Sequence, residues 1–530
     1  MRLHANITGV GLCLALAACG NSANAPIADT GPGDVSPLSD AEYRALSGTQ
    51  RYAVANTLLA TLYQGTPVLQ FFSLAGDLDN PAVKPDAPEL ERIRTALATP
   101  LSAADSARYL AKANSYTYFT EATVTVNTKY YSTRPLVLPQ AVLFEFPLSK
   151  DYYHRWMAYV LMNTVLFSPA LELESVYTPA VSGVYERLVA LLDQGRPMRD
   201  IVYEHMTSPP NWERFRSPED NTREMMEIFL ARFIDAEVPP AAAACKNWSV
   251  VRDPANGVTR IVKGPNANTV PQTVLGTTVV SCEEFYRALA DHPALIPTMA
   301  TVLVNHFFSD DSLEAKRKLI ASIVAAQPKT FDALFSLILL SKQYLLYTAR
   351  AKNAEESFFG LAHRVDWTPS PGFFEDFTDV RNPLSSSITL LRIGQATMLY
   401  KLGRASRAPT NTLHFSLHHK LIRESLLLNQ DFGTADVNRG WPAAQLLDDP
   451  AVASLPGNDF IHYLFLSAVA RRAQPTELDT LNTIITAKGY TTNRVAKTLV
   501  VFDYLSRLPE LYSFRGSERV TPPASSRVTP

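Results

Sequence analysis

Several familiar catalytic and metal-binding motifs are missing from this sequence of 530 residues. Its four cysteines include no C-x-x-C pair, the ligand spacing of many structural zinc sites and of c-type haem attachment. The G-x-S-x-G nucleophile elbow, the S-x-x-K motif with its partner motifs and the phosphate-binding P-loop are also absent. These absences argue against the hydrolases that use those motifs, and no motif in the sequence identifies a cofactor or a set of metal ligands.

An excess of charge of one sign is also missing. Lys and Arg total 49, and Asp and Glu total 51, so that the formal net charge is −2 at pH 7. Without a basic field the chain has no general attraction for nucleic acid or for anionic lipid headgroups. We therefore predict no nucleic-acid partner.

The apolar run at the start of the chain is too short to span a membrane. Arg2 precedes an apolar stretch at residues 7–18, which is shorter than the ~20 residues of a spanning helix and is typical of a secretory signal. The segment 16–19, Leu-Ala-Ala-Cys, resembles the lipobox of bacterial lipoproteins, in which the cysteine, here Cys19, carries the lipid and becomes the mature N-terminus. A cleaved signal with a chance cysteine is the alternative.

A polar segment, residues 20–38, follows Cys19 and is rich in Asn, Ala, Ser, Gly, Pro and Asp. It has too little apolar surface to offset the entropy of ordering, so we predict a flexible tether. Gly20 and Asn21 follow the cysteine in place of an aspartate, which by the usual sorting pattern predicts the outer membrane. A lipid on Cys19 would attach the protein there without a spanning helix.

Two cysteines lie beyond the signal segment. In an exported chain, Cys245 and Cys282 favour one disulfide, which would stabilise the fold by about 3–4 kcal/mol on the chain-entropy model. The residues between them, about 247–281, are predicted to form a small β-type insert with its turn at residues 255–257, Ala-Asn-Gly.

The fold class that we predict is mainly α: a multi-helix, orthogonal or bundle-like body with this small β-type insert and a mixed N-terminal lobe. The chain is longer than one typical core, which stops growing near ~250–300 residues. The predicted segments are the signal 1–19, the tether 20–38, the mixed lobe 39–149, the helical body 150–514 and a disordered tail 515–530. Apolar periodicity and Pro, Gly, Ser or Asp breaks predict body helices at 151–167, 179–193, 197–207, 219–235, 282–290, 294–308, 313–326, 330–349, 354–364, 387–403, 413–428, 458–472, 475–487 and 490–507.

The mixed lobe opens with a capping-box pattern, Ser-Asp-Ala-Glu at residues 39–42. Helices are predicted at 88–98 and 102–111. Strand is predicted at 118–126, where β-branched residues alternate, and within 136–146, which is apolar and contains proline.

One stretch, from Asp220 to Phe308, carries a family resemblance. Residues 219–229 read E-D-N-T-R-E-M-M-E-I-F and resemble the E-N-x-A-R-E-L-L-E-L-F signature of the bacterial family called domain of unknown function 1800. The segments around His292 and His306 resemble that family's L-A-x-H-P and L-W-x-H-F pieces. Asn268, Thr269 and Gln272 stand where the family has His, Asp and Lys.

The resemblance extends over roughly residues 150–470, with Gly394-Gln395 and Gly440-Trp441-Pro442 similar to the family's C-terminal G-Q and G-W-P pieces. The family has no settled activity. Its members are often encoded beside secreted sulfatase-like proteins, which implies an extracellular process that involves polysaccharide.

Three carboxylates and an arginine are predicted to share one helix face. Asp220, Glu224 and Glu227 recur at helical spacing, with Arg223 beside them. One interpretation is a cation site or an acid/base pair. In the other, the acidic residues stabilise a helix N-terminus and Arg223 is their structural ion-pair partner.

The histidines allow similar alternatives. His292 precedes a proline, and His306 lies on an apolar helix face. If His306 met the carboxylate face, the group would resemble a carboxylate–histidine metal site, whereas a hydrogen-bonded core histidine is the alternative. His414 and His418, next to His419, share one predicted helix face that suits either a metal or solvent.

Two functions follow from these observations. The preferred one is a non-catalytic binding or scaffold module, attached to the outer membrane by its lipid and facing a protein partner in the cell envelope. It accounts for the lipobox, the tether, the missing nucleophile motifs and the replaced His/Asp/Lys group. The alternative is a secreted metal-dependent or acid/base hydrolase of an extracellular substrate such as polysaccharide, with candidate site residues Asp220, Arg223, Glu224, Glu227, His292 and His306.

Overall fold

The computed structural model describes residues 33–65, 68–72, 90–116, 124–126, 129–131, 134–166, 178–215, 217–253, 259–364 and 446–514, together with residues 367, 369, 374, 419 and 422. The signal with Cys19, most of the tether, His414, His418 and the tail at 515–530 lie outside these residues, as do the predicted helices 387–403 and most of 413–428.

The fold is mainly helical, as the sequence predicts, with strands only in small two-stranded sheets in the described part of the chain. The N-terminal elements are α1 (Asp40–Ala45), α2 (Gly48–Thr61), α3 (Val68–Phe71), α4 (Leu90–Ala98), α5 (Ala103–Asn114), β1 (Val124–Val126), β2 (Lys129–Tyr131) and α6 (Arg134–Glu145).

The body follows with α7 (Lys150–Met162), α8 (Thr178–Asp193), α9 (Met198–Met206), α10 (Pro209–Arg214), α11 (Pro218–Leu230), η1 (Asp235–Glu237), α12 (Val238–Ala244), α13 (Cys282–Asp291), α14 (Leu295–Phe307), α15 (Leu313–Ala326), α16 (Phe331–Leu339), η2 (Gln343–Tyr347) and α17 (Ala354–Arg364). The C-terminal elements are η5 (Leu446–Asp448), α22 (Pro450–Ala453), α23 (Gly457–Val469), α24 (Pro475–Ala487), α25 (Arg494–Leu505) and η6 (Pro509–Tyr512).

Local capping explains where several helices begin. Ser39 and Glu42 form the predicted capping box at the start of α1, and Ser281 and Glu284 form another at the start of α13. In each, the serine oxygen accepts a backbone N–H of the first turn while the glutamate accepts the N–H of the cap residue. Helix starts of this kind are readable from sequence because both partners lie within four residues.

The β insert consists of two antiparallel hairpins, β3 (Trp248–Arg252) with β4 (Thr259–Lys263) and β5 (Gln272–Val274) with β6 (Thr277–Val279). The turn between β5 and β6 is made by Leu275 and Gly276, both with positive φ, as a two-residue type I′ hairpin requires. The turn predicted at 255–257 lies between β3 and β4, outside the described residues.

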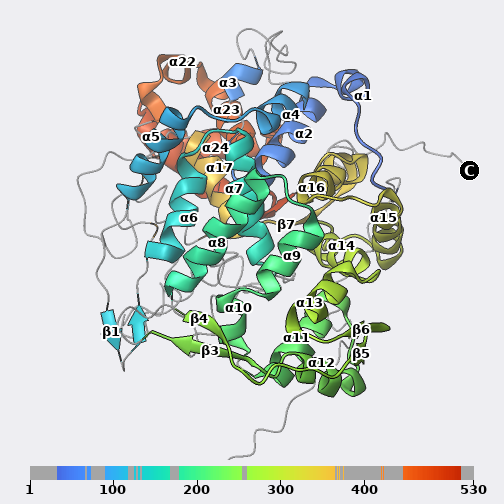
Figure 1. Ribbon diagram of the computed structural model, residues 1–530. Coiled ribbons are helices and arrows are strands. Elements are labelled where there is room, and N and C mark those ends of the chain that lie inside the picture. The colour runs from blue at the N-terminus through green and yellow to red at the C-terminus, as the bar shows by residue number, and fades with distance from the viewer. Residues whose placement is uncertain are drawn as a thin grey trace, which may run out of the picture.

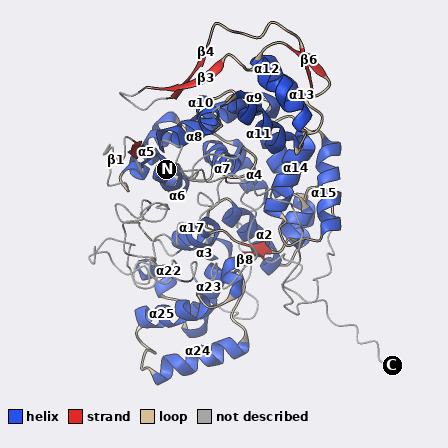
Figure 2. Cartoon of the chain, turned by 90° about the horizontal axis from the view of Figure 1, so that it is seen from below, coloured by secondary structure: helices blue, strands red, loops and turns tan. Residues whose placement is uncertain are grey.

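One hydrophobic core contains residues of the N-terminal elements and of the body alike. Helices α6, α7 and α8 pack against one another in the middle of the molecule (Figure 1). The β insert lies at one end, and α23, α24 and α25 lie at the other (Figure 2). None of the helices in the described stretches combines the length and the apolar character that crossing a bilayer requires.

Two predictions of secondary structure are wrong. The segment 136–146, predicted to include strand, lies mostly in α6, with Pro139 inside the helix. A short apolar run is compatible with a buried helix as well as with a strand, and here Ala141, Val142 and Leu143 are all buried. The single helix predicted at 330–349 is divided into α16 and η2, because the backbone between them pairs with residues before α1. Leu38 N–H donates to the Leu340 carbonyl (2.9 Å), and Lys342 N–H donates to the Ser36 carbonyl (2.9 Å).

Both ends of the described chain are joined to this central segment. Strand β7 (Arg350–Ala351) pairs antiparallel with β8 (Ser513–Phe514), and Pro37 forms a β-bridge with Ser341. Residues near 340–351 therefore contact the first and the last described segments. The last segment also covers Arg350, because the Phe514 ring lies over its guanidinium. The prediction of a flexible tether over 20–38 is wrong for its last residues, 33–38, because Val35 and Leu38 are buried in the core.

A buried histidine connects three helices of the body. His154 on α7 is 1% exposed, with Nδ1 2.6 Å from an Asp193 carboxylate oxygen and Nε2 3.0 Å from an Asp332 carboxylate oxygen. Burial lowers the pKa of His154, but the hydrogen bonds and charges of Asp193 and Asp332 outweigh it and raise the pKa to about 9.

We expect the stability contributed by the His154 contacts with Asp193 and Asp332 to disappear as the solution becomes alkaline. A pKa raised from 6.5 to about 9 means that the stabilisation is complete below pH 6.5 and is lost as pH rises through 9. Because both carboxylates are partly exposed, we expect only about 1–2 kcal/mol. The difference in unfolding free energy between wild type and His154→Gln should shrink by that amount from pH 6.5 to pH 9.5, and a pH-independent difference would contradict the assignment.

Candidate functional site

The predicted carboxylate face lies on the more exposed side of α11. Asp220 and Arg223 are exposed, and Glu224 and Glu227 are partly buried, while Met225 on the other side of the helix is in the core. The Arg223 guanidinium lies 3.8 Å from an Asp235 carboxylate oxygen across the loop after the helix. Ser217 caps the helix start, so the acidic residues of the first turn also face the positive end of the helix dipole.

The two predicted histidines occupy different environments. His306 on α14 is 2% exposed, and its ring lies edge-on to Phe307. His292 ends α13, where its Nδ1 accepts the Ala294 N–H (3.0 Å) and its carbonyl accepts a hydrogen bond from Arg199 (3.1 Å). Burial, followed by the charge of Arg232, lowers the pKa of His292.

The six candidate residues therefore lie on neighbouring helices without forming one group of metal ligands. Helix α11 packs against both α13 and α14. Nevertheless, within the stretches that the structure describes, no three His, Cys, Asp or Glu side chains are placed to hold a metal ion.

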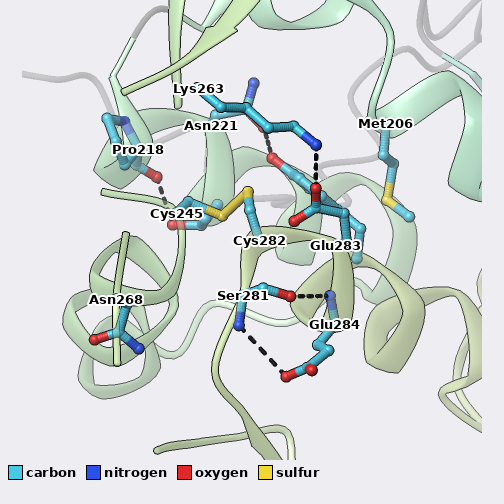
Figure 3. Close-up of a disulfide and its surroundings, with 12 residues drawn as sticks. Met206, Pro218, Asn221, Cys245, Lys263, Asn268, Ser281, Cys282, Glu283 and Glu284 are labelled. Carbon is cyan, nitrogen blue, oxygen red and sulfur yellow. Dashed lines mark hydrogen bonds and ion pairs between the residues drawn. A yellow bond between two sulfur atoms is a disulfide. The ribbon is translucent and has the colours of Figure 1, made fainter. Parts of the chain in front are cut away.

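The disulfide predicted from the sequence is present. Cys245 at the end of α12 is bonded to Cys282, the first residue of α13 (Figure 3), and both are fully buried. It closes the base of the β insert, as the sequence predicts. Lys263 of β4 strengthens the same junction, because its ammonium pairs with Glu283 and lies 5.0 Å from the centre of the Trp248 ring.

Two of the residues that stand at the His and Lys positions of the predicted family resemblance hold the insert's backbone. The Asn268 amide donates to the carbonyls of Val270 (2.6 Å) and Val280 (2.9 Å). The Gln272 amide donates to the Val270 carbonyl (3.1 Å). These two side chains make hydrogen bonds that order a loop.

A polar pocket that the sequence does not predict is lined by residues of α2, of the end of α23 and of β8. These elements lie away from the β insert (Figure 2). Its volume is about 290 Å³. The polar residues that line it are Asn56, Thr57, Lys352, Arg471, Gln474, Glu510 and Ser513.

The titratable group of greatest interest in this pocket is Lys352. It is 6% exposed, its ammonium donates to the Leu511 carbonyl (3.2 Å), and it lies 4.9 Å from the centre of the Phe514 ring. Burial, together with the positive charges of Arg364 and Arg350, lowers the pKa of Lys352 to about 7, although the Glu356 carboxylate opposes this shift. Near neutral pH, Lys352 thus changes its charge with small changes in its surroundings.

Behind Lys352 lies a buried ion pair. The two terminal nitrogens of Arg350 lie 2.9 and 2.8 Å from the two Glu356 oxygens, and both side chains are almost completely buried. Arg350 also donates to the Tyr344 hydroxyl (2.6 Å) and lies 4.5 Å from the centre of the Phe514 ring. Glu356 accepts the Asn353 N–H (2.9 Å), which fixes the start of α17.

The opposite wall of the pocket is held by Arg471. Its guanidinium makes two hydrogen bonds to Glu477 (2.7 and 2.9 Å) and lies 3.6 Å from Glu510. On the α2 side, Arg364 donates to the Asn56 amide oxygen (2.7 Å). Arg471, which lines the pocket, is therefore held in place by Glu477, and Arg364 is held by Asn56 of the pocket wall. Lys352, by contrast, has a pKa of about 7.

The sequence does not predict this pocket because four separate stretches of the chain line it: residues 53–57, 352, 469–474 and 510–514. One local signal was present: residues 350–356, Arg-Ala-Lys-Asn-Ala-Glu-Glu, are strongly charged yet lie between the apolar segments 331–347 and 358–362. Charged residues between buried segments are candidates for paired, functional groups. No protein-family model, curated protein or solved structure matches the chain, and its resemblance to domain of unknown function 1800 stays a prediction from the motifs.

Proposed function

We propose that this chain is an exported lipoprotein, attached to the outer membrane through Cys19, whose helical body is a non-catalytic module that binds a small molecule. The observation that carries the binding function is the Lys352 pocket. It combines a defined volume, several hydrogen-bonding side chains and one titratable group with a pKa near 7, which together are typical of ligand sites.

Export is supported by the sulfur chemistry. A buried disulfide such as Cys245–Cys282 persists in oxidising compartments and is rare in the cytosol. The lipobox segment at 16–19 and the polar tether after it support attachment by a lipid. The candidate residues on α11, α13 and α14 form no group of metal ligands in the described structure, so the binding function rests on the pocket alone.

The anchor is tested by replacing the lipidated residue. In a Gram-negative host, we expect wild-type protein in the outer-membrane fraction, resistant to high-salt and alkaline washing, with an N-terminal peptide whose mass includes the lipid. Cys19→Ala should lose the lipid mass and most of the outer-membrane association. Cys13→Ala, which changes the other cysteine of the signal, is the matched control and should behave as wild type.

The opposite result would refute the anchor. If Cys19→Ala remained as firmly bound to the outer membrane as wild type, or if the wild-type N-terminal peptide carried no lipid, attachment through Cys19 would be wrong.

A further inference from the structure

We propose that the pocket around Lys352 binds a small, hydroxylated monocarboxylic acid of the size of a sugar acid, and that Lys352 takes up a proton when this acid binds. The inference rests on the proposed binding function and names the ligand class. It is carried by the geometry and the charges of the pocket, taken in three steps.

The first step is size and polarity. A volume of about 290 Å³ is near the lower end of the ~300–1,000 Å³ typical of ligand sites, and suits a ligand as large as a monosaccharide. The amides of Asn56 and Gln474 and the hydroxyls of Thr57 and Ser513 line it. Groups that both donate and accept hydrogen bonds are suited to a ligand with several hydroxyls.

The second step is charge. On the core side, the charges of Arg350, Arg364 and Glu356 act on Lys352. On the pocket side, Arg471 and Glu510 line the pocket together with Lys352. Burial and two guanidinium groups disfavour the ammonium form of Lys352. A ligand carboxylate beside Lys352 adds a negative charge and therefore stabilises that ammonium form. Glu510 on the opposite wall repels a second negative charge, which favours a carboxylate over a phosphate dianion.

The third step is proton linkage. With a pKa of about 7, Lys352 is half protonated at pH 7, and a carboxylate binds its ammonium form more tightly. Binding therefore draws a proton from solution at neutral and alkaline pH. Below pH 6 the ammonium is already present, so the affinity no longer changes with this group.

The test is calorimetric titration of the purified full-length protein with glucuronate at pH 6, 7 and 8, in two buffers of different ionisation enthalpy. Glucose serves as the neutral probe and glucose 6-phosphate as the phosphorylated probe. We expect glucuronate to bind with uptake of about 0.5 proton at pH 7 and with a Kd about tenfold higher at pH 8 than at pH 6, since the competent fraction falls by that factor.

Variants assign the proton to Lys352. Lys352→Arg keeps a positive charge and should bind glucuronate without proton uptake and without the pH dependence. Lys352→Met should lose both the uptake and at least tenfold in affinity at pH 6. Gln474→Ala removes a side chain of the pocket wall that also belongs to the capping box of α24, so it should weaken binding while the proton uptake remains. Lys318→Met, at an exposed position on α15, is the matched control and should equal wild type.

Each other outcome overturns the inference. Glucuronate binding without proton uptake, or with uptake retained in Lys352→Arg, would show that Lys352 is not the linked group. Binding of glucose or glucose 6-phosphate in place of glucuronate would refute the ligand class and leave the proposed binding function standing. If none of the three probes bound, the pocket would support neither the ligand class nor the proposed function.

Discussion

Replacement of Arg350 by methionine is expected to lower the free energy of unfolding by about 3–5 kcal/mol, because it leaves the Glu356 carboxylate as an uncompensated charge in the core. Arg350 is 0% and Glu356 2% exposed in the side chain, so solvent cannot replace the lost partner. The same change removes the hydrogen bond to the Tyr344 hydroxyl and the cation beside the Phe514 ring. Urea unfolding followed by circular dichroism measures the loss.

Two further variants show whether burial is the cause. Arg44→Met removes an arginine from a surface pair with Glu91, whose side chains are 58% and 63% exposed, and should cost at most about 0.5 kcal/mol. The double variant Arg350→Met with Glu356→Leu removes both buried charges and should recover part of the lost stability. A loss for Arg350→Met as small as that for Arg44→Met would contradict this account.

Removal of the disulfide is expected to lower the free energy of unfolding by about 3–4 kcal/mol. Cys245 and Cys282 are separated by 37 residues, and closing a loop of this length reduces the entropy of the unfolded chain by that amount on the chain-entropy model. The double variant Cys245→Ala with Cys282→Ala avoids a leftover thiol. Urea unfolding of this variant gives the total loss.

The same variant should loosen the β insert before the rest of the protein. Trp248 follows Cys245 closely and lies 5.3 Å from Trp212 and 6.1 Å from Tyr286, measured between ring centres, so its fluorescence reports on this junction. In the variant, we expect the fluorescence to change at a lower urea concentration than the helical circular-dichroism signal. In wild type, we expect both signals to change at the same urea concentration. Coincident transitions and an unchanged midpoint in the variant would contradict the predicted role of the disulfide.

Helix positions were predictable wherever local signals agree. The predicted ranges 313–326, 354–364 and 475–487 coincide with α15, α17 and α24, and the cysteine-flanked β insert and its disulfide are also as predicted. Caps and breaks lie within a few residues of these elements, so a single sequence contains the information. The same holds for the polar face of α11, whose residues recur at helical spacing.

The predictions of secondary structure were wrong or incomplete where prolines begin a helix or where the backbone pairs with residues far away in the sequence. Helices α10 and α12 were not predicted, because each has two prolines in its first turn, and these prolines read as breaks although that position tolerates them. The division between α16 and η2 depends on backbone pairing with residues 36–38. The Lys352 pocket depends on contacts among α2, α23 and β8, and the hydrophobic periodicity within one segment cannot predict contacts between segments that are far apart in the sequence.

The antiparallel pairing of β7 with β8 also bears on the order in which the molecule assembles. Phe514 covers the Arg350 guanidinium, so a nascent chain that is synthesised from its N-terminus cannot enclose its central charge pair until residue 514 has emerged. Contacts of such high sequence separation form late and slowly. Under the export that we propose, the interval before the interior closes leaves the polypeptide loose enough to be threaded through a narrow channel.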